Sequence, residues 1–102
     1  MVRVASTDDL EPETAKQVEA GGLTLCLART DDGDYCAVDD ECSHEEYWLS
    51  EGEVWGDEIE CPKHGSKFNL RTGAVRGLPA TQPVRAYHTQ VEGDDVLVEV
   101  PS

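Results

Sequence analysis

Two short Cys/His motifs constrain the fold of this chain more than any other feature of its sequence. The first motif reads Cys42-Ser43-His44, and the second, Cys61-Pro62-Lys63-His64, follows after sixteen intervening residues. Each motif offers one thiolate and one imidazole, close enough in sequence to reach a single metal centre from one tight loop. The sequence therefore predicts a metal site to which both loops contribute.

The charge of the chain limits its partners. The 102 residues suffice for one domain with a modest core, and 22 acidic against 8 basic residues give a net charge of −14. This charge argues against nucleic-acid binding through phosphate neutralisation and against docking on anionic membranes. It suits a basic protein partner, although plain solubility or a salty cytoplasm would explain it equally well.

The N-terminal residues, the lack of a long apolar stretch and the cysteine content predict the cellular compartment of the protein. Residues 1–10 contain no apolar signal segment, and no stretch approaches the length that a membrane span needs. We therefore expect a cytoplasmic protein. In a reducing compartment, its four cysteines are metal ligands or bystanders rather than two disulfides.

A period of two in the apolar residues predicts an all-β domain. Thr7 is expected to cap one helical turn, and the turn at residues 31–34 to join a hairpin that places Cys26 opposite a residue near Asp39 and Cys36 opposite one near Arg29. Both cysteines are interpreted as small buried hydrophobes. The expected strands cover residues 2–4, 14–20, 23–28, 35–38, 67–70, 83–90 and 95–100.

The pairing of the ligands selects between two metal centres. Zinc accepts two Cys and two His, but zinc modules usually pair Cys with Cys and His with His along the chain. Here each loop supplies a mixed pair. A two-iron centre with two Cys on one iron and two His on the other takes one of each from each loop, which is the known exception to all-cysteine ligation.

At this point the sequence resembles the Rieske [2Fe–2S] family, whose motif is C-x-H, a spacer of about this length, and C-x-x-H. Gly65 after the second motif, the segment 49–52 and the Gly77-Leu78-Pro79 loop also match the family, so that the resemblance covers essentially the whole chain. It implies an antiparallel β-sandwich in which a cluster-binding module, residues 41–80, is inserted into a basal framework of residues 1–40 and 81–102.

The resemblance also implies the ligands of one [2Fe–2S] cluster. Cys42 and Cys61 would bind the inner iron, His44 and His64 the outer iron, and Ser66 would donate a hydrogen bond to a cluster sulfur. In high-potential members, each ligand loop has an extra cysteine, and a tyrosine stands where this chain has a phenylalanine, Phe68. Because these features are absent and carboxylates flank the first motif, we expect a potential at the low end of the family range.

The implied function is electron transfer without catalysis. The chain resembles the ferredoxin components of bacterial aromatic-ring dioxygenases, monomeric carriers between a flavin-dependent NAD(P)H reductase and a terminal oxygenase or other redox enzyme. The small subunit of a nitrite reductase and a zinc-stabilised interaction module are the alternatives. The acidic residues 39–46 are a candidate docking surface, whereas Trp48 and Trp55 are expected to pack in the core or a loop and His88 to lie near the surface of a strand.

Overall fold

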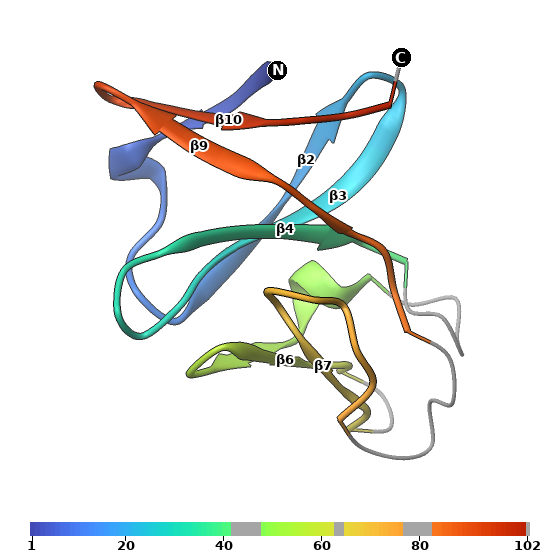
Figure 1. The fold of residues 1–102 in the computed structure, drawn as a ribbon. Helices are drawn as coiled ribbons and strands as arrows, with labels where there is room; N and C mark the ends of the chain where they lie inside the picture. Colours follow the sequence, from blue (N-terminus) through green and yellow to red (C-terminus); the bar gives the residue numbers. More distant parts are fainter. Residues whose placement is uncertain (42–47, 63–64, 77–82, 102) are drawn as a thin grey trace.

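The computed structural model describes residues 1–41, 48–62, 65–76 and 83–101, and within them it confirms an all-β, antiparallel fold. The ten strands found among the described residues form three sheets (Figure 1). In chain order the elements are β1 Val2–Ser6, η1 Thr7–Asp9, β2 Thr14–Ala20, β3 Leu23–Arg29, β4 Tyr35–Asp39, η2 Leu49–Glu51, β5 Glu53–Trp55, β6 Glu58–Glu60, β7 Lys67–Asn69, β8 Ala86–Tyr87, β9 Thr89–Glu92 and β10 Asp95–Val98.

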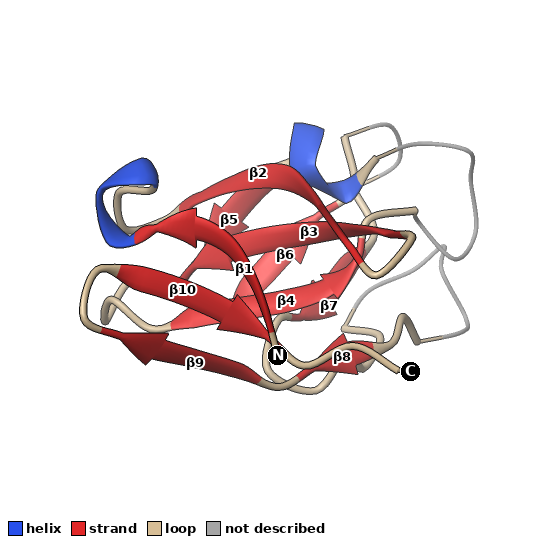
Figure 2. Ribbon diagram, turned by 90° about the horizontal axis from the view of Figure 1, so that it is seen from above, coloured by secondary structure: helices blue, strands red, loops and turns tan. Residues whose placement is uncertain are grey.

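The sheets stack with the longest strands in the middle. The first sheet has the order β1-β10-β9, the second β2-β3-β4-β8 and the third β5-β6-β7. Figure 1 shows the third sheet on the opposite side of β3 and β4 from β9 and β10, and Figure 2 shows the same layers from above. The second sheet is therefore covered on both faces.

Alternation along β3 fills two separate apolar layers. Leu25 and Leu27 point into the layer against the first sheet, together with Val96 and Val98 of β10. Cys26 and Ala28 point into the layer against the third sheet. All four side chains on β3 are fully buried, as expected for a strand between two sheets, because successive residues of a strand face opposite sides.

The hairpin between β3 and β4 is confirmed, and its two cysteines pair with residues directly next to Asp39 and Arg29, near which their partners were expected. Cys26 pairs with Val38 and Cys36 with Ala28. The turn is held by Thr30, whose N–H donates to the carbonyl of Asp34 over 2.8 Å. The two cysteines are not opposite each other, as expected, and both are buried and free.

The last predicted hairpin is more complex than the sequence pattern indicates. The expected strand over 83–90 is two strands separated by His88, with β8 pairing to β4 in the second sheet and β9 pairing to β10 in the first. This segment therefore passes from one sheet to the other. Near the N-terminus, Ser6 and not Thr7 is the residue before the helical turn, and its N–H donates to the Asp9 carboxylate over 2.9 Å.

The third sheet contains two strands that the sequence analysis missed. β5 and β6 have three residues each and bury one side chain each, Val54 and Ile59. Three residues are too few to show a period of two. The strand predicted over 67–70 is β7, whose Phe68 is fully buried opposite Ile59 of β6.

Candidate metal centre

Of the four predicted ligands, only Cys61 is among the described residues, and Cys42, His44 and His64 lie outside them. Cys61 directly follows β6 and is 1% exposed. Its N–H donates to the carbonyl of Ser66 over 2.7 Å, and its carbonyl accepts the N–H of Gly65 over 3.2 Å. These two bonds fix both ends of the second ligand loop between β6 and β7.

Ser66, the residue predicted to donate a hydrogen bond to the cluster, is among the described residues. The residue is fully buried and belongs to the few buried polar residues of the described chain. Its backbone faces that of Cys61 across the loop. Its predicted role as a donor to the cluster stays a prediction.

The surroundings of Cys61 suit a thiolate-bound iron centre. Cys61 packs in the same apolar layer as Ile59, Phe68 and Val84, so that little water reaches the thiol from this side. A buried free thiol beside a buried hydroxyl, in a chain whose motifs add a second thiol and two imidazoles, is the donor set of a mixed Cys/His iron–sulfur centre. The described residues therefore fit the group.

The base of the first ligand loop is fixed by a group that the sequence analysis interpreted differently. Asp40 is fully buried, and its carboxylate accepts hydrogen bonds from Ser50 N–H, over 2.7 Å, and from the Ser50 hydroxyl, over 2.9 Å. Gln17 Nε2 also donates to this carboxylate, over 2.7 Å. Asp40 thus cannot belong to an exposed docking surface, contrary to the prediction for residues 39–46.

The neighbouring carboxylate is also engaged within the chain. Asp39 accepts the Tyr87 hydroxyl over 2.6 Å and the N–H of Arg85 over 3.3 Å. Burial, and then the hydrogen bond to Asp39, raise the pKa of Tyr87 to about 12. Among the described members of the acidic run, only Glu41 is exposed. The proposed docking surface is therefore narrower than the sequence indicates.

The two other cysteines are bystanders in the core, as predicted. Cys26 and Cys36 belong to the same apolar layer as Cys61. Burial first, and then the nearby Asp40, raise the pKa of the Cys26 thiol well above its ordinary value. Burial is also the largest cause that raises the pKa of Cys36. Both thiols are therefore protonated near neutral pH.

The two tryptophans do not pack as expected. Trp48 is 41% and Trp55 is 53% exposed, so that neither contributes to the core. Trp48 pairs with Glu41 in an isolated antiparallel bridge beside the first ligand loop. His88 is exposed, as predicted, although it lies between two strands and not within one.

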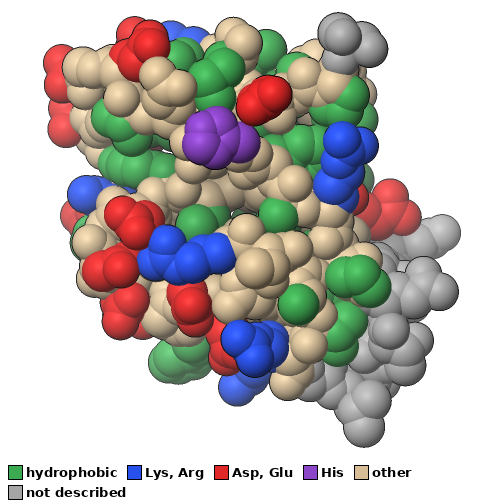
Figure 3. All heavy atoms as spheres, in the orientation of Figure 1, with side chains coloured by type: hydrophobic (Ala, Val, Ile, Leu, Met, Phe, Trp, Pro, Cys, Tyr) green, Lys and Arg blue, Asp and Glu red, His purple; other side chains and the backbone are tan. Residues whose placement is uncertain are grey.

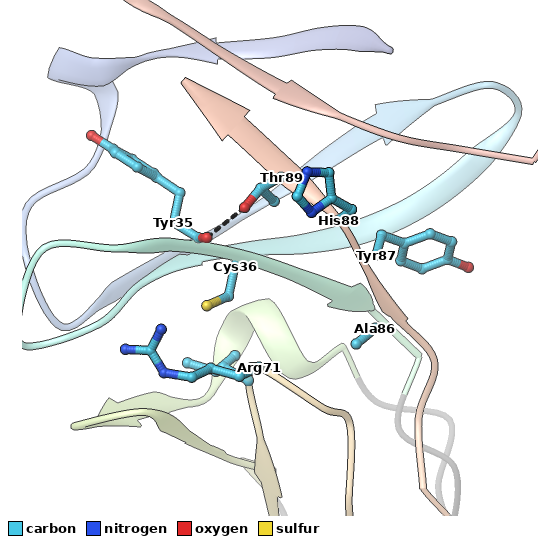
Figure 4. A pocket seen from close by; sticks show the side chains of 8 residues that line it. Tyr35, Cys36, Arg71, Ala86, Tyr87, His88 and Thr89 are labelled. Carbon is cyan, nitrogen blue, oxygen red and sulfur yellow. Dashed lines mark hydrogen bonds between the residues drawn. The ribbon is translucent and has the colours of Figure 1, made fainter. Parts of the chain in front are cut away.

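A cavity of about 290 Å³ opens between β4, the β8–β9 segment and the turn after β7. Figure 4 shows Cys36, His88 and Arg71 along its wall, and Thr89 donating to the carbonyl of Tyr35. The Arg71 guanidinium is bound to Asp32 and Asp34, over 3.2 and 2.9 Å. Figure 3 shows basic and acidic side chains side by side on this face of the molecule. Among the described residues, the only cationic Arg or Lys side chain that lines this cavity is therefore already paired with carboxylates.

Fold and donor set together define the chain as an iron–sulfur electron-transfer protein. The Rieske [2Fe-2S] domain model matches residues 1–88, and the chain therefore belongs to the Rieske [2Fe-2S] family. This confirms the resemblance noted in the sequence, and with it a single [2Fe–2S] cluster as the cofactor.

Curated relatives span nearly the same length. The chain is 37% identical to the ferredoxin component of biphenyl 2,3-dioxygenase from Rhodococcus jostii (strain RHA1), over 98% of this chain and 92% of the relative. It is 37% identical to ferredoxin CarAc of Metapseudomonas resinovorans, over 95% and 91%. These relatives are named as ferredoxins, and the chain is accordingly an electron carrier and not itself a catalyst.

Solved structures agree with this assignment. The ferredoxin of carbazole 1,9a-dioxygenase from Nocardioides aromaticivorans IC177 superposes with a TM-score of 0.89 at 39% identity, over 95% of this chain and 94% of that one. A complex of reduced oxygenase and oxidized ferredoxin in carbazole 1,9a-dioxygenase contains a chain with a TM-score of 0.89 at 35% identity, over 96% and 100%. A putative nitrite reductase small subunit, at 22% identity and a TM-score of 0.83 over 97% of both chains, shares the fold alone.

Proposed function

We propose that this chain is the ferredoxin component of an aromatic-ring dioxygenase system and carries single electrons from a flavin-dependent NAD(P)H reductase to a terminal oxygenase. The observation that supports it most is the match to dioxygenase ferredoxins over nearly the full length of both chains. One of these relatives was solved in a complex with its oxygenase. We further propose that the protein acts as a monomer in the cytoplasm. No helix of the described residues is long and apolar enough to cross a bilayer.

The proposed ligands are the four residues of the two motifs. Cys42 and Cys61 would hold one iron, and His44 and His64 the other, within a module of residues 41–80. When bound, the cluster supplies reversible one-electron exchange. The described residues contribute a dry, fixed support, because Cys61 is buried and both ends of its loop are hydrogen-bonded. Ser66 is the proposed hydroxyl donor to the cluster.

Three buried cysteines provide matched variants for the ligand assignment. Cys61→Ser is expected to lose the cluster, whereas Cys26→Ser and Cys36→Ser should keep it, since all three thiols lie in one apolar layer and only Cys61 is a proposed ligand. Iron content and the visible absorption spectrum of the purified proteins measure the difference. Full iron content in Cys61→Ser would contradict the assignment.

The proposed partners are tested by reconstitution. The protein is mixed with NADH, the flavin reductase and the terminal oxygenase of a biphenyl or carbazole dioxygenase, and product formation is followed. Product should form only when all three proteins are present. In a mixture without the oxygenase, NADH and the reductase should still reduce the ferredoxin. The proposed partners are wrong if neither the biphenyl nor the carbazole reductase reduces this protein and neither oxygenase accepts electrons from it. The cofactor assignment would be unaffected.

A further inference from the structure

Asp40 is a buried carboxylate that has no cationic partner among the described residues. Charged side chains are almost never fully buried unless they are paired. Asp40 is fully buried, yet each ion pair found between described residues joins other carboxylates. Such an arrangement is costly and needs a reason.

Neutral donors hold this carboxylate in one orientation. One carboxylate oxygen accepts the Ser50 N–H, and the other accepts the Ser50 hydroxyl and Gln17 Nε2, over distances of 2.7 to 2.9 Å. An amide N–H can only donate, so both oxygens of Asp40 act as acceptors, as in an ionised carboxylate. These bonds stabilise the negative charge without neutralising it.

The same residue closes the base of the first ligand loop. The carbonyl of Asp40 accepts the N–H of Leu49 over 2.6 Å, and its N–H donates to the carbonyl of Thr24 over 3.2 Å. The next pair along the chain, Glu41 and Trp48, forms an antiparallel bridge. Residues 40–41 and 48–50 are therefore fastened together at the point where the ligand-bearing segment leaves the second sheet.

Asp40 is close in the sequence to one of the proposed iron ligands. Asp40 precedes Cys42 by two residues, and two fully extended residues span at most about 7 Å. A charge on a fully buried side chain acts on its surroundings with little screening by water or salt. Its field already reaches one neighbour, because Asp40 contributes to the raised pKa of the Cys26 thiol.

We propose that Asp40 is a positioning residue for the first ligand loop whose fixed negative charge lowers the reduction potential of the cluster. A negative charge disfavours the addition of an electron nearby. Ser50 and Gln17 set the strength of this effect because their hydrogen bonds delocalise and orient the charge. The inference rests on the proposed ligand set and is independent of the proposed partners.

A redox titration of the holoprotein tests this proposal with two variants, whose reduction potentials are expected to shift in opposite directions. Asp40→Asn removes the charge and keeps the shape, so reduction should become at least tenfold more favourable, equivalent to about 59 mV for one electron. Gln17→Leu removes a donor and leaves the charge less compensated, so reduction should become about threefold less favourable. Gln17 is largely exposed, and its variant should fold even if Asp40→Asn assembles poorly.

Asp39→Asn is the matched control, because it removes the same charge from the adjacent, half-exposed position. We expect less than a threefold change there, since Asp39 does not fasten the loop. The inference is overturned if Asp40→Asn and Asp39→Asn shift the equilibrium equally, or if Gln17→Leu makes reduction easier. If Asp40→Asn holds no iron, the sign of the Gln17→Leu shift decides. The titration needs no partner protein, so failure of the dioxygenase reconstitution leaves it intact.

Discussion

The two apolar layers on either side of the second sheet are built in different ways. The layer against the first sheet consists of aliphatic side chains from long strands, such as Leu25, Leu27 and Val96. Among the described residues, the layer against the third sheet contains three cysteines and one phenylalanine, and its side chains come from β3 and β4 on one side and from three-residue strands and loops on the other. Three of the four buried polar residues of the described chain, Asp40, Ser66 and Asn69, lie along this second side.

The difference suggests a division of roles in one small domain between a structural support and the region that would bear the proposed ligands. In the first layer, alternating apolar residues determine the strands and their register, and backbone pairing satisfies the polar groups. In the third sheet, on the far side of the second layer, the strands are too short for this, and buried polar side chains hold the loops instead. We therefore expect substitutions in the first layer to change stability alone, and substitutions in the second to change metal binding as well.

The largest effect is expected when one large side chain is removed from each layer. Phe68→Ala should lower the free energy of unfolding by about 3–5 kcal/mol and Leu27→Ala by about 2–5 kcal/mol, since both side chains are fully buried. Only Phe68→Ala should also lower the iron content, because Phe68 shares its layer with Cys61. Urea denaturation and iron analysis measure the two effects. Equal iron loss in both variants would remove the distinction between the layers.

A smaller effect is expected where a side chain holds a turn in the third sheet. The side-chain oxygen Oδ1 of Asn69 accepts the backbone N–H groups of Arg71 and Thr72, over 2.9 and 3.1 Å, and the residue is buried. Asn69→Ala leaves these donors unsatisfied and should cost about 1–3 kcal/mol. Asn69→Asp keeps an acceptor and serves as the control in the same denaturation experiment. If both variants lose the same stability, the hydrogen bonds are not what holds this turn.

Removing a side-chain hydrogen bond from the basal framework, residues 1–40 and 81–102, should cost still less stability. The Tyr35 hydroxyl donates to the carbonyl of Thr7 over 2.7 Å and joins the β3–β4 hairpin to η1. Tyr35→Phe removes this one bond and should cost about 0.5–1.5 kcal/mol with no change in iron content. A larger loss, or any loss of iron, would show that polar side chains hold the framework as they hold the third sheet.

The smallest effect is a loss of stability in mild alkali. The folded-state pKa values of Cys26, Cys36 and Tyr87 are raised, mainly by burial. Groups of this kind contribute full stability below their unfolded pKa values, about 8.5 for Cys and 10 for Tyr, and that contribution is lost as pH rises toward the folded values. Urea midpoints should therefore be level from pH 7 to 8 and fall from pH 9 upward. Cys26→Ala should reduce the slope, and an unchanged slope would exclude this thiol as the cause.

The contrast between the two apolar layers also explains which elements could be predicted from the sequence. The strands of the first two sheets could be predicted because their apolar residues, such as Leu25, Cys26 and Leu27 of β3, either form a continuous run or alternate with polar residues. The register of the β3–β4 hairpin could be predicted only to within about one residue, since the turn is set by Thr30 and Asp34 and not by the apolar pattern. The passage of 83–90 between two sheets was missed for a similar reason. No periodicity marks the point, at His88, where a strand changes partners.

The candidate site followed from ligand chemistry, but its support did not. The order of Cys and His in the two motifs indicated the cofactor without any structure. Asp40 was grouped with an acidic surface, since a sequence cannot distinguish an exposed carboxylate from one that is buried by Ser50 and Gln17. The exposure of Trp48 and Trp55 was also unexpected, because size and apolarity alone favour burial.

Metal and sulfide analysis of the purified protein is the most direct test of the central claim. A chain that carries one electron on a mixed Cys/His centre should contain about two irons and two acid-labile sulfides per molecule. About one zinc per molecule and no sulfide would instead identify a structural metal site and contradict the account.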